Sequence, residues 1–180
     1  KYGSGRAQGD FGVKLIGKDG AYFDDLKIQM QVSEISKFVQ QSGSPIEVDG
    51  KLTSNIDHIS FAPSGIITKA DGVIKWKNAM ASLGPEKLPL GDFTLSLKSK
   101  GSSVEAKLKD AGGPVEANIV ITLAHNGDIA INGKVGYRPD AHKVLINIMK
   151  MPFRGKSEKI LNIKGNILQR DKLIAEFMKP

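Results

Sequence analysis

Cysteine is absent from the 180-residue sequence, arginine is scarce, and aromatic residues make up only 6% of it. Without cysteine there are no disulfides, no thiolate nucleophiles and no cysteine-ligated zinc or iron–sulfur centres. No run approaches the ~20 apolar residues that a membrane-spanning helix needs, and no cleavable signal stands at the start. Because the chain opens with Lys1 rather than Met, we expect it to be a fragment, with any membrane helix or targeting segment upstream.

The charge is strongly positive but is carried mainly by lysine. The formal net charge is +7, and only 4 of the 26 basic residues are arginine. Proteins that read bases and phosphates rely on the bidentate arginine fork, and single-strand binders stack bases on exposed aromatic rings. The lysines alternate with apolar residues, as in "KWK", "KLK" and "KSK", and therefore indicate a solvated face. We expect no nucleic-acid partner.

Hydrophobic residues recur with a period of two, which is typical of strands with one dry and one wet face. In 93–97 the residues Phe93, Leu95 and Leu97 alternate with polar ones. Turn signals separate successive runs of this kind, most clearly "DAGGP" at 110–114 and "HNGD" at 125–128. Glycines inside several runs predict bulges and therefore curvature. The predicted strands or hairpins are 11–17, 21–32, 45–56, 58–62, 64–79 with a turn at 69–72, 93–109, 115–137 and 161–167.

We therefore predict a mainly β protein: one domain over residues 1–180, built as a curved antiparallel β-meander sheet with two short helices. Whether the sheet forms a trough, a sandwich or a partly open barrel stays open. The helices are predicted at 32–41 and at 138–150, because apolar residues there fall at helical spacing. Asp140 can cap the second helix. The segment 170–180 is interpreted as a frayed final strand or half-turn.

No set of residues in the sequence converges on a chemical reaction. His58, His125 and His142 lack the spacing that would bring two of them to one face as metal ligands. Asp24 and Asp25 are strand neighbours, which point to opposite faces, so they indicate solvated residues or a bulge. "GSGRAQG" and "DAGGP" lack the context of phosphate loops, and no serine lies in a nucleophile elbow. The sequence predicts a non-enzymatic protein with no catalytic, metal or cofactor site.

The segment 72–168 resembles the second half of the type II secretion system protein N family, and "YGSGRAQG" near the start matches the family more weakly. A tryptophan strand, a Leu-Gly-Asp start, an Asp-x-Gly-Gly-Pro turn and a Gly-x-Val-x-Tyr-Arg-Pro close carry the resemblance. The matching residues are turn and strand positions, which we expect to be structural rather than catalytic, with the tryptophan as a core anchor. They are Trp76, Gly91, Asp110, Gly112, Gly113, Pro114, Gly133, Tyr137 and Pro139.

The resemblance implies the periplasmic domain of a Gram-negative inner-membrane protein, attached through an N-terminal helix absent from this fragment. It also implies a role in assembly or support of the secretion machinery, with other components of the type II system as partners. From the residues alone, we expect contacts at a sheet edge, whose unpaired backbone groups can add a strand. The alternative is a periplasmic β-groove protein that holds a lipid or acyl chain against the apolar face.

Overall fold

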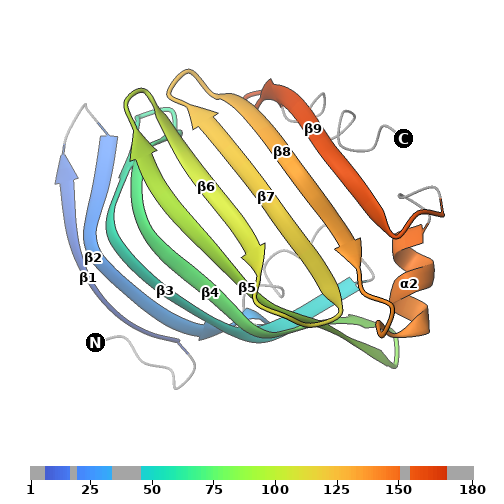
Figure 1. Cartoon of the computed structure of the whole chain (residues 1–180). Coiled ribbons are helices and arrows are strands. Elements are labelled where there is room, and N and C mark those ends of the chain that lie inside the picture. Colours follow the sequence, from blue (N-terminus) through green and yellow to red (C-terminus); the bar gives the residue numbers. More distant parts are fainter. Residues whose placement is uncertain (1–6, 17–19, 34–45, 151–154, 170–180) are drawn as a thin grey trace.

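The computed structural model describes residues 7–16, 20–33, 46–150 and 155–169. These residues form nine strands and a short helix (Figure 1). The elements are β1 (Ala7–Ile16), β2 (Gly20–Gln31), β3 (Ile46–Phe61), β4 (Ile67–Leu83), β5 (Glu86–Lys100), β6 (Ser103–Asp110), β7 (Val115–Ala124), β8 (Asp128–Tyr137), α2 (Lys143–Lys150) and β9 (Glu158–Asn166).

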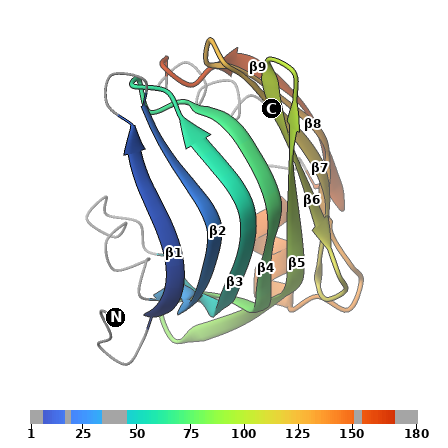
Figure 2. The same ribbon diagram turned by 90° about the vertical axis from the view of Figure 1, so that its left-hand side faces the viewer.

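All nine strands belong to one antiparallel sheet in which each strand pairs with its neighbour in sequence, from β1 to β9. The sheet is not closed into a barrel, and Figure 2 shows it curving around one side, which we call the inner face. The predicted curved antiparallel meander is confirmed. Of the three forms that the sequence left open, the structure has the open, curved sheet.

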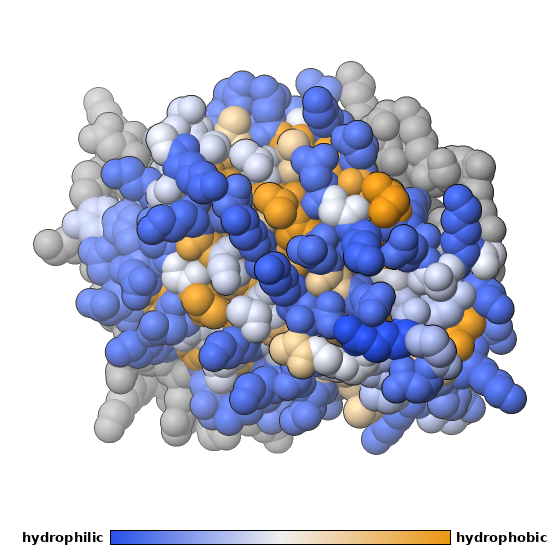
Figure 3. All heavy atoms as spheres, in the orientation of Figure 1, coloured by the Kyte–Doolittle hydropathy of each residue, from blue (hydrophilic) through white to orange (hydrophobic). Residues whose placement is uncertain are grey.

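The alternation of apolar and polar residues sets the two faces of this sheet. In one cross-strand row Leu97 lies opposite Ala106, Ala106 opposite Ile121, Ile121 opposite Ile131, and Ile131 opposite Ile163. Neighbouring rows on the inner face are similarly apolar. The other face carries the exposed lysines and is mostly hydrophilic (Figure 3), as the alternation predicts. Among these lysines are Lys75, Lys98, Lys107, Lys109, Lys134 and Lys164.

The turn predicted at 69–72 is wrong, because β4 runs through it and the actual turn lies at 62–66. Gly72 has a φ of 150°, and a Cβ there would lie 2.5 Å from the carbonyl oxygen of Asn55 in β3. The β3–β4 register shifts beside it, between Ile56 and His58. Gly72 therefore permits the backbones of β3 and β4 to approach closely at a bulge. In addition, β3 is one strand rather than the two predicted at 45–56 and 58–62.

The second predicted helix is shorter than 138–150, since α2 begins only at Lys143. Asp140 does not cap it; His142 does, because its Nδ1 accepts a hydrogen bond from the Val144 amide at 3.3 Å. The first predicted helix falls mostly on residues outside those described, as does the segment 170–180. In the part of the chain that the structure covers, no helix has the length and apolar content to cross a bilayer.

Candidate functional site

The end of the sheet beside α2 contains a buried hydrophobic cluster, and we call it the helix end. Its buried cluster joins strand residues to the loop and helix that follow β8. The Trp76 and Phe93 rings lie opposite each other on β4 and β5 with centroids 5.8 Å apart, and the Trp76 Nε1 donates to the Asp49 carbonyl at 3.1 Å. The buried members are Ala79, Phe93, Val115, Ala117, Ala141 and Leu145.

Glycines allow two segments of backbone to touch at this end. A Cβ on Gly91 in β5 would lie 2.5 Å from the Gly112 carbonyl oxygen, and one on Gly113 would lie 2.4 Å from the Gly91 Cα. All three glycines have positive φ. Asp92, next to Gly91, donates its amide to the Gly112 oxygen at 3.2 Å. The Asp-x-Gly-Gly-Pro turn is thus held flat against β5 in a way that a side chain would prevent.

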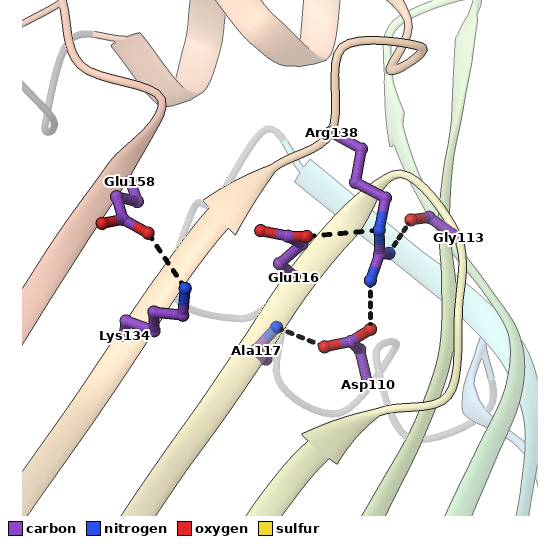
Figure 4. Close-up of polar contacts among 7 residues, drawn as sticks. All are labelled: Asp110, Gly113, Glu116, Ala117, Lys134, Arg138 and Glu158. Carbon is purple, nitrogen blue, oxygen red and sulfur yellow. Dashed lines mark hydrogen bonds and ion pairs between the residues drawn. The ribbon is translucent and has the colours of Figure 1, made fainter.

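Arg138 holds the same turn from the other side (Figure 4). Its Nη2 contacts an Asp110 carboxylate oxygen at 2.7 Å, its Nε lies 3.3 Å from a Glu116 carboxylate oxygen, and its Nη1 donates to the Gly113 carbonyl. The second Asp110 oxygen accepts a hydrogen bond from the Ala117 amide at 2.9 Å. The guanidinium fork suits this task because its donors are planar and fixed.

The electrostatics agree with this geometry. Partial burial raises the pKa of Asp110, but the hydrogen bonds from Arg138 and Ala117 outweigh it, so the pKa lies below its usual value. The hydrogen bond to Asp110 correspondingly raises the pKa of Arg138. Asp110 is therefore ionised near neutral pH. We call the contacts of Arg138 with Asp110, Glu116 and Gly113 the Arg138 clamp; it contains an ion pair rather than a group that transfers protons.

The family-type residues gather mostly at this end. Gly91, Gly112 and Gly113 meet, Asp110 contacts Arg138, and Trp76 is partly buried against the core cluster. Pro114 accepts a hydrogen bond on its carbonyl from the Arg138 amide at 2.8 Å, and Tyr137 lies opposite Val115. Pro139 lies between β8 and α2. Gly133 is apart, in the middle of β8, where a Cβ would lie 2.1 Å from the Asn118 oxygen.

β9 provides a second feature, because it is an edge strand. Among the described residues it pairs with β8 alone. Ile160, on the lysine-bearing face, is 67% exposed, and Leu168, just after the strand, is 64% exposed; in the part of the chain described, these are the large apolar residues that stand out to solvent. Leu161 and Ile163 of the same strand are buried. An ion pair from Lys134 to Glu158, 3.2 Å long, links β8 to β9 (Figure 4).

The titratable residues considered from the sequence lie apart from these features. Within the described ranges, no three His, Asp or Glu side chains are grouped to hold a metal ion. His125 lies at the β7–β8 turn and His142 before α2. Asp25 has a φ of 53°, and the β1–β2 register shifts beside it, between the Asp10–Lys27 and Gly12–Asp24 pairs, so the bulge that was one of the expected alternatives is present. His58, however, contacts both Asp24 and Ser60.

Sequence reasoning missed two contacts of this kind. Arg138 belongs to the quoted motif, but its partners come from residues 22 to 28 positions earlier, and periodicity carries no signal for such a pairing. The Asp24–His58 contact spans 34 positions and requires the β2–β3 register. In each case the sequence showed a charged residue in a predicted turn or bulge. It gave no sign of the distant residue that this side chain contacts.

Comparison with known proteins gives one match. The profile of the family described as "Type II secretion system (T2SS), protein N" matches residues 2–156. No curated protein and no solved structure matches the chain. The matched range contains the clamp, the glycine contact and the core of the helix end, so the resemblance of the turn motifs and the profile agree. The chain belongs to the type II secretion system protein N family.

Proposed function

We propose that this chain is a non-enzymatic periplasmic component of the type II secretion machinery, located at the inner membrane. Its role is assembly or support of the apparatus through contacts with other inner-membrane or periplasmic components. Membership of the family carries the link to type II secretion. The helix end supports a mechanical role, because its contacts fix turns and strands to one another rather than presenting reactive groups.

The observation that carries the contact role is the exposed apolar pair on the edge strand. Ile160 and Leu168 are 67% and 64% exposed, and they lie along and just beyond β9. The same strand is fixed to the sheet by Leu161 and Ile163, which are 4% and 6% exposed. An edge strand that is packed against its sheet and has apolar side chains toward solvent offers a partner both backbone pairing and apolar burial.

Pull-down with the 180-residue chain against the periplasmic domains of other secretion-system components tests this role. Ile160→Lys and Leu168→Lys are expected to reduce capture at least tenfold, since a lysine ammonium would be desolvated at the contact. Asn132→Lys adds the same charge on the exposed face of neighbouring β8 and serves as the control. The proposal fails if no component is enriched over an unrelated basic β domain, or if both edge variants bind as the unaltered chain does.

A second candidate, binding of a lipid or acyl chain to the inner face, is favoured by one specific observation. Away from the helix end, most apolar residues on the inner face of the central strands keep part of their surface exposed, although Val104 is buried. Covering such apolar surface with an acyl chain is favourable by ~25 cal/mol for each Å² removed from water. The partly exposed residues are Leu95, Leu97, Ala106, Ile119, Ile121, Leu123, Ile129 and Ile131.

Native mass spectrometry of the purified chain distinguishes the two candidates. Acyl-chain binding predicts an added lipid mass that organic extraction removes and that Ile121→Lys lowers. A spectrum with no lipid adduct, both as purified and after incubation with phospholipid, rejects this candidate. It leaves the β9 contact role unaffected, since Ile160 and Leu168 lie outside the inner rows.

A further inference from the structure

Four exposed lysines lie together on the lysine-bearing face of strands β3, β4 and β6, and we call them the lysine patch. Lys75 and Lys77 are two residues apart on β4 and therefore share a face, and Lys51 on β3 lies directly opposite Lys77. Lys109 on β6 lies in the same cross-strand row as Lys75, with Thr94 of β5 between them. Neighbouring members are ~5–10 Å apart at their Cα atoms, which is within about one Debye length at physiological salt.

The charge of the patch is not neutralised within the sheet. In the part of the chain that the structure describes, none of the four lysines forms an ion pair. Asp92, on β5 beside the patch, instead accepts a hydrogen bond from the Asn78 amide at 2.7 Å. Lys51 and Lys77 are directly opposed, and like charges in this arrangement destabilise a pair of strands. The patch therefore has a positive charge that an anionic partner would relieve.

Other lysines of the same face have carboxylate partners, which makes the patch distinct. These carboxylates are held by their own lysines, so they do not neutralise the patch. The pairs are Lys98–Asp71 at 3.7 Å, Lys100–Glu105 at 2.9 Å, Lys107–Glu105 at 3.2 Å and Lys134–Glu158 at 3.2 Å.

The chemistry of the patch favours lipid phosphates over a protein as its partner. Protein interfaces are depleted of lysine and depend on aromatic or arginine anchors. The row that contains Lys75 and Lys109 continues through Thr53, Thr94 and Asn118, with no aromatic or apolar side chain from β3 to β7. A lysine ammonium is a hydrated point charge that attracts phosphate without a fixed geometry. We propose that the lysine patch docks the chain on a membrane surface of anionic phospholipid headgroups.

The curvature of the sheet suits this docking. The patch lies on strands β3 to β6, in the middle of the nine-strand order, and the sheet curves around its inner face, so the lysine-bearing face is convex (Figure 2). The middle of a convex face meets a flat surface before its edges do. The apolar inner face then points away from the membrane, and β9 lies at the edge of the sheet rather than under it. The inference goes beyond the β9 contact role and does not depend on it.

Vesicle co-sedimentation with the 180-residue chain tests the inference. The chain is expected to bind vesicles of phosphatidylglycerol mixed with phosphatidylcholine but not vesicles of phosphatidylcholine alone. Binding should fall steeply as the salt rises from ~50 to ~500 mM, because the contact is electrostatic and exposed. The triple variant Lys75→Gln, Lys77→Gln, Lys109→Gln is expected to bind roughly tenfold or more weakly, since each lysine near an anionic surface strengthens binding severalfold.

The matched control removes the same charge from exposed lysines outside the patch. Lys143→Gln and Lys150→Gln lie on α2, and Lys156→Gln lies before β9. This triple variant has the same net charge as the patch variant, and it is expected to bind within about threefold of the unaltered chain. Equal binding by the two triple variants would show that net charge acts rather than the patch, and would overturn the inference. Unchanged circular dichroism of both variants shows that the fold is kept.

A second readout identifies the face that meets the membrane. Because the chain has no cysteine, one introduced thiol takes a single dye. A polarity-sensitive dye on Ser96→Cys, in the exposed row next to the patch, is expected to shift its emission to shorter wavelength on anionic vesicles. The same dye on Asn147→Cys, exposed on α2, is expected to show no shift. Equal responses at the two positions would contradict docking through the patch.

Two further results would also overturn the inference. Equal binding to both kinds of vesicle would remove the role of headgroup charge. Release of the chain from the vesicles by polyglutamate, at the same concentration of negative charge, would identify an acidic protein segment as the partner instead. Ile121→Lys, on the inner face, is expected not to lower vesicle binding, and a loss there would show that the inner face meets the lipid. None of these results changes the β9 contact role, because Ile160 and Leu168 lie outside the patch.

Discussion

Strand β5 passes through two environments on the same inner face. At the helix end Phe93 is 8% exposed and packs among Trp76, the start of β7 and α2. Leu97, four residues further along, belongs to a row whose members on β5 to β8 all keep part of their surface exposed. The residue types are equally apolar, so composition does not explain the difference. Position explains it, because α2 is eight residues long and, among the described residues, packs over the helix end.

This difference separates two uses of an apolar sheet face. At the helix end, apolar burial, a glycine contact and the Arg138 clamp lie close together. Substitutions at these three features are therefore expected to have non-additive effects on stability. Along the middle rows each side chain is supported mainly by its neighbours on the sheet. The helix end is thus expected to determine stability, whereas the middle rows can change with a smaller loss of stability and are free to contact a ligand.

The largest expected effect distinguishes the two environments directly. Phe93→Ala is expected to lower the free energy of unfolding by about 3–4 kcal/mol, because it leaves a cavity in a packed cluster. Leu97→Ala is expected to cost about 1 kcal/mol, since part of that side chain is already exposed. Chemical denaturation of both variants gives the measurement. Equal losses would show that the middle rows are as tightly packed as the helix end.

The glycine contact gives the next effect. Gly91→Ala is expected to cost about 3 kcal/mol, because φ is 111° and the new methyl group would collide with the Gly112 oxygen. Gly101, in the turn between β5 and β6, has a φ of 57° with open space around it, so Gly101→Ala costs only about 1 kcal/mol. Thermal melts of the pair provide the test. A Gly91 variant as stable as the Gly101 variant contradicts the close approach.

The clamp predicts a pH dependence. The pKa of Asp110 is lowered in the folded chain, so its ionised form adds stability above the unfolded pKa, about 3.9, and this contribution is lost as the pH falls through the lower folded value. Asp110→Asn is expected to lower the free energy of unfolding by about 1–2 kcal/mol at pH 7. It should also reduce the loss of stability as the pH falls below ~4. In an Arg138→Gln background the same change should cost less. Additive losses at pH 7 would rule out the clamp.

The smallest effect is expected at the edge strand. Ile160→Thr should change the free energy of unfolding by less than about 0.5 kcal/mol, because the side chain is mostly exposed and threonine keeps the β-branch. Chemical denaturation measures this directly. A loss above 1 kcal/mol would mean that Ile160 is part of the folded core rather than free for a partner.

Much of the fold was predictable from particular residues. The alternation of Phe93, Leu95 and Leu97 with polar residues predicted the faces, and the turns at 110–114 and 125–128 are where the sequence placed them. Local signals sufficed because a strand and its turn are decided within a few residues. The turn predicted around Gly72 was wrong, because a glycine signals positive φ or close approach but does not distinguish a chain reversal from a bulge.

The candidate sites were less predictable. The sequence motif pointed to Asp110, Gly112 and Gly113 but not to the partners that give them a role. The spacing of His58 from the other histidines gave no sign of a metal site, and its contacts with Asp24 and Ser60 depend on the β2–β3 register. Such contacts are decided by strand pairing over 28 to 34 positions, for which a single sequence has no local signal.

By itself the sequence determined a lysine-rich, cysteine-free antiparallel meander and a resemblance to its family, because periodicity, turn chemistry and motif spacing are properties of neighbouring residues. Only the tertiary structure decided that the sheet stays open, that α2 covers one end of its inner face, and that Arg138 and His58 meet their partners. Those outcomes depend on curvature and register accumulated over nine strands. Small local deviations at bulges such as Gly72 and Asp25 add up there to the shape of the whole sheet.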